Sequence, residues 1–178
     1  NYEAADMLKK LSSIMQYVYS RDYKAVTLGN EIHWVDQYLS LQKFRLMDVF
    51  SYQIDFPDVY KEWPCCKLFL QPFVENSIEH GFAGVDHPGF VSIRFEMAGQ
   101  ELLIRIMDNG KGLGGGAVAA GSGHISRASQ IIKDRIYLLN IKLKTKAGFR
   151  IDNNPDGNGV LVQIHLPILY KDQIKVYV

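Results

Sequence analysis

The chain has 178 residues, of which 47% are hydrophobic and 22% are charged, proportions typical of a soluble globular protein with one sizeable core. Its formal net charge of +1 gives no electrostatic reason to expect nucleic acid or an anionic membrane as a partner. No apolar run approaches the roughly 18 residues that a membrane span needs, and no signal peptide is recognisable. We therefore expect a soluble, cytosolic piece of a longer protein, with Cys65 and Cys66 as reduced thiols in or near the core.

Two amphipathic helices are predicted at the start of the chain. Apolar residues recur three and four positions apart over residues 2–21, opposite charged Lys9 and Lys10. A second such pattern runs from Gly29 to about residue 46, with Thr27 or Asn30 as its cap. Neither helix can bury its apolar stripe alone, so we expect them to pack on each other or on a partner helix.

A strand over residues 49–56 leads to a third helix, predicted from Gln71 to His80 and ended by Gly81 as a C-cap. One face of this helix is apolar. Asn76 and His80 lie four residues apart on another face, beside the polar pair Glu75 and Glu79. Burying such a polar stripe without partners is costly, so from the helix alone a solvated face is the simpler interpretation.

The rest of the chain reads as strands with one more helix. Residues 89–97 and 101–107 alternate as the two strands of a hairpin, and residues 110–123 form a glycine-rich loop. A helix is predicted over residues 129–143, followed by a strand at 149–152, a turn at 153–159 and a strand at 160–166. This order predicts an α+β protein, a two-layer sandwich with helices on one face of a mixed sheet.

Three stretches resemble sensor histidine kinases of the LytS/YesM-like type. They are VTLGNEIHWVDQYLSLQKFRL at residues 26–46, LQPFVENSIEHG at 70–81 and IMDNGKG at 106–112. The resemblance covers roughly residues 1–167 and implies the GHKL (Bergerat) ATP-binding sandwich. It further implies that residues 1–48 are the second half of the dimerisation and phosphotransfer region, an N-terminal helical remnant, and that residues 49–178 are the ATP-binding catalytic domain.

The resemblance assigns roles on the third helix. It implies that Asn76 gives an amide oxygen to Mg²⁺, that Glu75 polarises the attacking group, and that His80 contacts a phosphate or the ribose. Each has a simpler alternative: an asparagine bonded to nearby backbone, a surface carboxylate, and a packed histidine. Glu79 stands where the family usually has a lysine.

Further roles fall on the glycine-containing turns. The resemblance implies that Asp108 accepts the exocyclic amine of adenine and that Gly110 and Gly112 let the backbone approach the ring. An ordinary Asp-Asn-Gly turn is the alternative. Gly157 and Gly159 resemble the closing turn of the family, with Val160 in place of its threonine. A plain turn explains them equally well.

The second glycine box departs from the common pattern. Its usual glycines fall on Ser126 and Ala128, which together with His124 fit a variant of the subfamily. In that variant the hydroxyl of Ser126 and the first amides of the following helix would contact the phosphates.

The implied function is that of the cytoplasmic ATP-binding catalytic domain of a membrane sensor histidine kinase that works as a homodimer. With ATP and Mg²⁺ it would transfer the γ-phosphoryl group to a histidine for relay to a response regulator of LytTR or AraC type. None of the five histidines lies in the PHFLFN context of the acceptor, which we therefore expect outside this chain.

Three alternatives stay open. One is a nucleotide-binding but inactive regulatory or interaction module, and another is an interaction domain that binds no nucleotide. The last is a different GHKL ATPase, against which Pro72 argues because it stands where an acidic residue would be needed.

Overall fold

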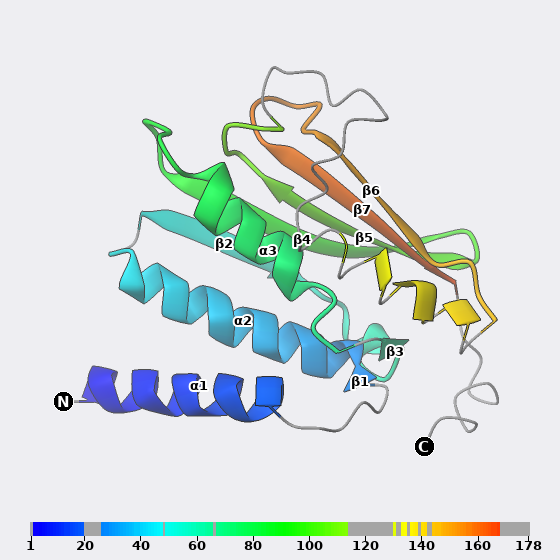
Figure 1. The fold of residues 1–178 in the computed structure, drawn as a ribbon, viewed down its shortest axis with the longest axis horizontal. Coiled ribbons are helices and arrows are strands. Elements are labelled where there is room, and N and C mark those ends of the chain that lie inside the picture. Colours follow the sequence, from blue (N-terminus) through cyan, green and yellow to red (C-terminus); the bar gives the residue numbers. More distant parts are fainter. Residues whose placement is uncertain are drawn as a thin grey trace.

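A five-stranded sheet covered on one face by helices forms the body of the protein (Figure 1). The computed structural model describes residues 2–19, 26–47, 49–65, 67–113, 130, 133, 134, 136–138, 140, 141 and 144–167. Helices α2 (Leu28–Arg45) and α3 (Gln71–Asn76) lie against the sheet, and α1 (Tyr2–Tyr19) lies on the far side of α2. The predicted two-layer α+β sandwich is confirmed.

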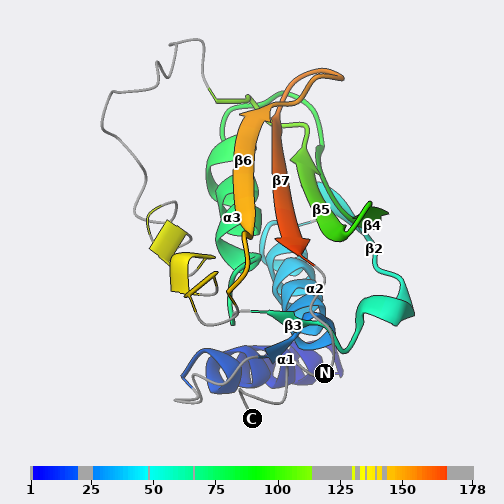
Figure 2. The same cartoon turned by 90° about the vertical axis from the view of Figure 1, so that its right-hand side faces the viewer.

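The sheet is mixed, as predicted. Its strands are β2 (Phe50–Asp55), β4 (Gly89–Ala98), β5 (Glu101–Asp108), β6 (Gly148–Asn153) and β7 (Val160–Pro167), in the spatial order β2-β4-β5-β7-β6. Strands β2 and β4 are parallel, and every other neighbouring pair is antiparallel. Figure 2 shows β6, β7 and β5 side by side in this order, with α3 next to β6. Because β5 and β7 are antiparallel neighbours, the end of β5 and the start of β7 lie side by side at one end of the sheet.

The core lies between the sheet and the helices. Alternate residues of the strands point inward, so that Ile93, Ile104 and Ile164 have no exposed surface. Leu28 and Leu39 of α2 are equally buried and belong to the same cluster. The sheet and α2 therefore share one core. Cys65 is 1% exposed, in agreement with a core thiol, and Cys66 lies outside the described residues.

The start of α2 is capped more completely than we predicted. The hydroxyl of Thr27 accepts the backbone N–H of Asn30 at 3.2 Å, and the Asn30 side chain accepts the N–H of Thr27 at 3.2 Å. Both candidate caps thus act together as a capping box. Two short strands that the sequence did not indicate, β1 (Val26–Thr27) and β3 (Pro64–Cys65), pair antiparallel beside this cap, and a 3₁₀ turn, η1 (Asp58–Tyr60), precedes β3.

The third helix differs from the prediction at its end. It changes after Asn76 into a π turn, η2 (Ser77–Gly81), which the N–H of Phe82 closes onto the carbonyl of Ser77 at 3.1 Å. Gly81 is part of this turn, and its φ is not positive. The prediction of Gly81 as the C-cap was therefore wrong, because Phe82 is the cap of this turn. Single π turns in α-helices occur frequently at functional sites.

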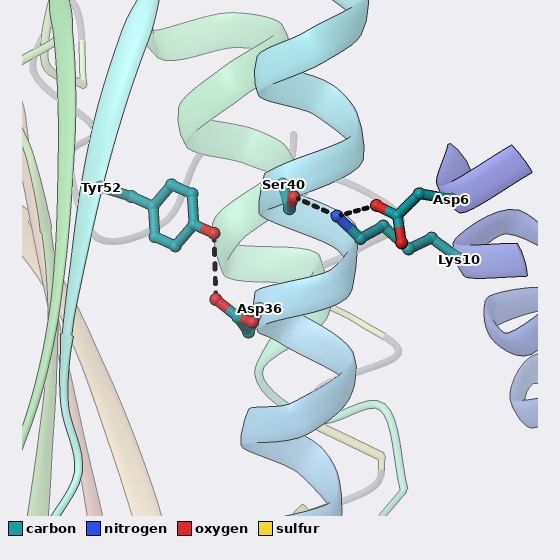
Figure 3. A network of polar contacts seen from close by, with 5 residues as sticks. All are labelled: Asp6, Lys10, Asp36, Ser40 and Tyr52. Atoms are coloured by element: carbon teal, nitrogen blue, oxygen red, sulfur yellow. Dashed lines mark hydrogen bonds and ion pairs between the residues drawn. The ribbon is translucent and has the colours of Figure 1, made fainter. Parts of the chain in front are cut away.

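Helix α1 contacts α2 through half-buried side chains, among them Lys10 and Tyr17. Figure 3 shows that the ammonium of Lys10 donates to Ser40 of α2 at 3.0 Å and pairs with Asp6 at 2.8 Å. On the other side of α2, the hydroxyl of Tyr52 donates to Asp36 at 2.9 Å, which ties β2 to α2. Burial, helped by the hydrogen bond and charge of Asp36, raises the pKa of Tyr52 to about 12. Leu8, Leu11 and Met15 stay exposed on α1.

Candidate functional site

Asp108, the last residue of β5, is the centre of the candidate site. Its side chain is only 4% exposed. One carboxylate oxygen, Oδ1, accepts the backbone N–H of Gly110 at 2.9 Å and that of Val160 at 3.1 Å. The other, Oδ2, accepts the hydroxyl of Ser77 at 2.7 Å. A single buried carboxylate therefore joins the end of β5, the start of β7 and the π turn after α3.

At two positions around Asp108 the backbone segments come so close together that only glycine fits. A Cβ on Gly110 would lie 2.5 Å from the carbonyl oxygen of Gly81, and a Cβ on Gly159 would lie 1.9 Å from the carbonyl oxygen of Asp108. Gly159 also has a φ of +110°, in the range that disfavours residues with a side chain. The turn after Asp108 thus packs directly on the π turn, where the N–H of Lys111 donates to the Gly81 carbonyl at 2.9 Å.

The other two predicted glycines lie further out. Gly112 has a φ of +77°, and a Cβ there would lie 2.9 Å from the side-chain oxygen of Asn153. Gly157 is exposed in the turn before β7, and a Cβ there would have no atom within 4 Å. The structure brings Gly110, Gly112 and Gly159 to the Asp108 end of the sheet and leaves Gly157 at the outer end of its turn.

The polar residues of the third helix and its π turn differ in how deeply they are buried. Ser77 is 5% exposed and is the residue of this motif that contacts Asp108. Its neighbour Asn76 is half-buried at the junction of α3 and the π turn, while His80 and Glu79 are exposed. Asn76 is therefore the sequence neighbour of the residue that contacts Asp108, and its side chain is only partly buried.

Glu75 is oriented by its own helix. Its carboxylate accepts the side-chain amide of Gln71 at 2.6 Å. Burial of Tyr38 on α2, together with the negative charges of Glu75 and Glu79, raises the pKa of that phenol above its ordinary value of 10.0.

Sequence reasoning missed several residues of the site. Ser77 was expected only as part of the apolar stripe, since its spacing is that of a buried position. Asn153 holds the turn by accepting the N–H of Leu113 at 2.9 Å, and Asn109 does so by accepting the N–H of Phe90 at 2.7 Å. Their only sequence signal was that asparagine is common in turns. Ser126, the predicted phosphate contact, lies outside the described residues.

The donor and acceptor pattern suits a ligand that carries an amino group. Each carboxylate oxygen has two lone pairs. Within the described part of the chain, Asp108 uses both on Oδ1 and one on Oδ2, which leaves one acceptor position on Oδ2. No cluster of three or more His, Cys, Asp or Glu side chains that could hold a metal occurs among the described residues.

Comparison with known proteins points to one class. The family model described as "Histidine kinase" matches residues 1–50. Sensor protein kinase HptS of Staphylococcus aureus is similar over 112 residues at 29% identity, both in strain USA300 and in strain NCTC 8325 / PS 47. The match covers 62% of this chain and 21% of the relative, so the chain spans about a fifth of the length of these curated relatives.

Solved structures share the fold. The histidine kinase domain of the Erythrobacter litoralis EL346 blue-light activated histidine kinase superposes with a TM-score of 0.59 at 16% identity, over 97% of this chain and 75% of the other. The catalytic domain of histidine kinase ThkA does so with a TM-score of 0.55 at 15% identity, over 82% and 95%. The chain therefore has the fold of GHKL histidine kinase catalytic domains. The family model and the curated relatives support a histidine kinase. Among the described residues, no helix is long and apolar enough to cross a membrane.

Proposed function

We propose that this chain is the ATP-binding catalytic part of a two-component sensor histidine kinase. In this role it transfers the γ-phosphoryl group of ATP, with Mg²⁺, to a histidine outside the 178 residues. The observation that carries the proposal is the buried carboxylate of Asp108, held by Ser77, Gly110 and Val160 with one acceptor position left. A carboxylate fixed in this way, beside glycine backbone, is suited to recognise the amine of an adenine ring.

Each candidate site residue has its own role in this proposal. Asp108 accepts the exocyclic amine, and the glycine turns at 110 and 112 bring backbone to the ring. Asn76 offers its amide oxygen to the metal, which neutralises charge on the phosphates when it is bound. His80 is exposed at the end of the π turn, where it can donate to a phosphate or the ribose. Glu75 polarises the acceptor, Ser126 contacts the phosphates, and Gly157 and Gly159 form the closing turn of the site.

Finer features belong to the same proposal. Residues 1–48 act as the second half of the dimerisation and phosphotransfer region, and residues 49–178 as the ATP-binding domain. The intact protein is a LytS/YesM-like homodimer anchored in a membrane, with this part in the cytoplasm, and it passes the phosphoryl group to a response regulator of LytTR or AraC type. The support is the motif resemblance together with the family-model match.

The first experiment is calorimetric titration of the chain with a non-hydrolysable ATP analogue and Mg²⁺. We expect a Kd from micromolar to sub-millimolar, about −5 to −8 kcal/mol. Asp108→Asn should weaken binding by about tenfold or more, since an amide nitrogen then faces the adenine amine. Asn76→Ala should weaken binding only when Mg²⁺ is present. Asp156→Asn, an exposed change in the turn before β7, is the control. A folded wild type that does not bind would refute the proposal.

A second candidate, a nucleotide-binding but inactive module, is favoured by the altered second glycine box and by Glu79 in place of lysine. Phosphotransfer separates the two functions. The full-length protein, incubated with radiolabelled ATP, should form acid-labile phosphohistidine if it is a kinase. Nucleotide binding without phosphohistidine would establish the regulatory module instead.

A further inference from the structure

Glu31 of α2 is a buried carboxylate at some distance in sequence from every motif of the site. It is 1% exposed, and burying an ionisable group is costly unless it is hydrogen-bonded. Its two oxygens accept the backbone N–H of Leu68 at 2.6 Å and of Phe69 at 3.1 Å, and the hydroxyl of Tyr17 donates to the same carboxylate. Glu31 thus joins α1, α2 and the segment that leads into α3.

The segment that Glu31 holds has an unfavourable backbone conformation. Leu68 has a φ of +59°, and left-handed conformations are rare for residues with a side chain. Two consecutive N–H groups that converge on one carboxylate stabilise this bend. Phe69 and Leu70 follow directly as buried residues, and the carbonyl of Leu70 accepts the N–H groups of Phe73 and Val74 in the first turn of α3. The bend therefore sets where α3, and Asn76 at its end, begins.

Tyr17 links α1 to the same bend. Its ring stacks on Trp34 of α2 with centroids 4.5 Å apart, and the ammonium of Lys67 lies 4.8 Å from the ring centroid. Tyr17 is thus the titratable side chain that contacts Glu31 from α1, and Lys67 contacts the Tyr17 ring from the segment before α3. In Figure 1 the end of α1, the start of α2 and the chain between β3 and α3 meet at one end of the molecule.

We propose that Glu31 is a positioning residue of the nucleotide site, which fixes α3 through the bend at Leu68 and couples that bend to α1 through Tyr17. The part that concerns nucleotide rests on the proposed function above. A shift of α1 along α2 would move the Tyr17 hydroxyl away from Glu31. The hydrogen bonds of Glu31 to the bend would then weaken, and Asn76 would be displaced. Because α3 is a single short helix between the bend and the π turn, it has little room to absorb such a change.

The test uses Tyr17→Phe, which removes the hydroxyl and keeps the aromatic ring, and Glu31→Gln, which keeps one acceptor oxygen. Lys10→Met is the matched control, because it removes a second polar contact between α1 and α2, the one to Ser40, without touching the bend (Figure 3). Hydrogen exchange of backbone amides without nucleotide is measured first. Protection at Leu68, Phe69 and Val74 should fall about two- to tenfold in Tyr17→Phe, as expected for one lost hydrogen bond, and further in Glu31→Gln.

Amides of β5 and β7 should be unchanged in Tyr17→Phe, and Lys10→Met should leave the bend as protected as in the wild type. The proposal would be overturned if Tyr17→Phe lost as much protection in β5 and β7 as at the bend, or if it lost no protection at Leu68 and Phe69. The exchange result decides the coupling whether or not nucleotide binds, so a failure of the proposed function is recognised separately, by a wild type that does not bind. If the wild type binds the ATP analogue, its Kd should rise in Tyr17→Phe and not in Lys10→Met. An unchanged Kd in Tyr17→Phe would refute the claim that the bend at Leu68 positions Asn76 for nucleotide binding.

Discussion

Removal of the Asp108 carboxylate should cost more stability than removal of its charge. In Asp108→Ala the N–H groups of Gly110 and Val160 lose their acceptor, and each buried donor left unpaired costs about 1–3 kcal/mol. The hydroxyl of Ser77 can turn to the carbonyl of Phe73, 3.3 Å away, and so adds little. The expected loss is about 2–6 kcal/mol.

Asp108→Asn should be milder. The amide oxygen can stay on the two backbone N–H groups, and the amide nitrogen can donate to the hydroxyl oxygen of Ser77. Only the extra strength of charge-assisted hydrogen bonds is then lost, about 1–2 kcal/mol. For a domain of this size 1 kcal/mol corresponds to about 2–4 °C in Tm.

The assay is urea unfolding followed by tryptophan fluorescence, with Asp156→Asn as the exposed control, expected within about 0.5 kcal/mol of the wild type. Equal stability of Asp108→Ala and Asp108→Asn would show that the carboxylate is not the acceptor on which the two N–H groups depend, and the reasoning would fail.

Two further predictions concern a glycine and the buried glutamate. Gly159→Ala should unfold the turn or lower the unfolding free energy by several kcal/mol, because its Cβ would lie 1.9 Å from the carbonyl oxygen of Asp108. Gly148→Ala is the control, since a Cβ there meets open space. Thermal melts in which both variants lose the same Tm would contradict this geometry. Burial raises the pKa of Glu31 above its ordinary value of 4.5, an effect that hydrogen bonds from Tyr17 and from backbone N–H groups oppose. The folded state therefore takes up the proton first, so this group's stabilisation is complete below pH 4.5 and is lost as pH rises through the raised value. The unfolding free energy of the wild type minus that of Glu31→Gln, measured by urea titration between pH 4.5 and 8, should fall with rising pH, and a rise would show that the sign is wrong.

The sequence by itself was enough for the strands of the main sheet, the helices α1 and α2 and the fold, although not for the short strands β1 and β3. Alternation with a period of two in residues 101–107 and 160–166, and apolar spacing of three and four in α2, are local patterns that a buried face imposes directly. The capping residues Thr27 and Asn30 were equally readable, because a cap is made within four residues of the chain. Asp108 and Asn76 could be named as site residues because their motifs resemble those of a known family.

Only the tertiary structure decided which side chains hold the site together. The bonds from Ser77 and Val160 to Asp108 join residues 31 and 52 positions apart in the chain, and no local pattern encodes such a pair. The π turn that brings Ser77 to Asp108 leaves the apolar spacing almost unchanged, so a periodicity search reads it as ordinary helix. The carboxylate of Glu31 looked like one charge on an amphipathic helix until the fold placed the N–H groups of Leu68 and Phe69 against it. Hydrogen bonds between distant segments depend on where the packed core brings the backbone, and that is a property of the folded chain as a whole.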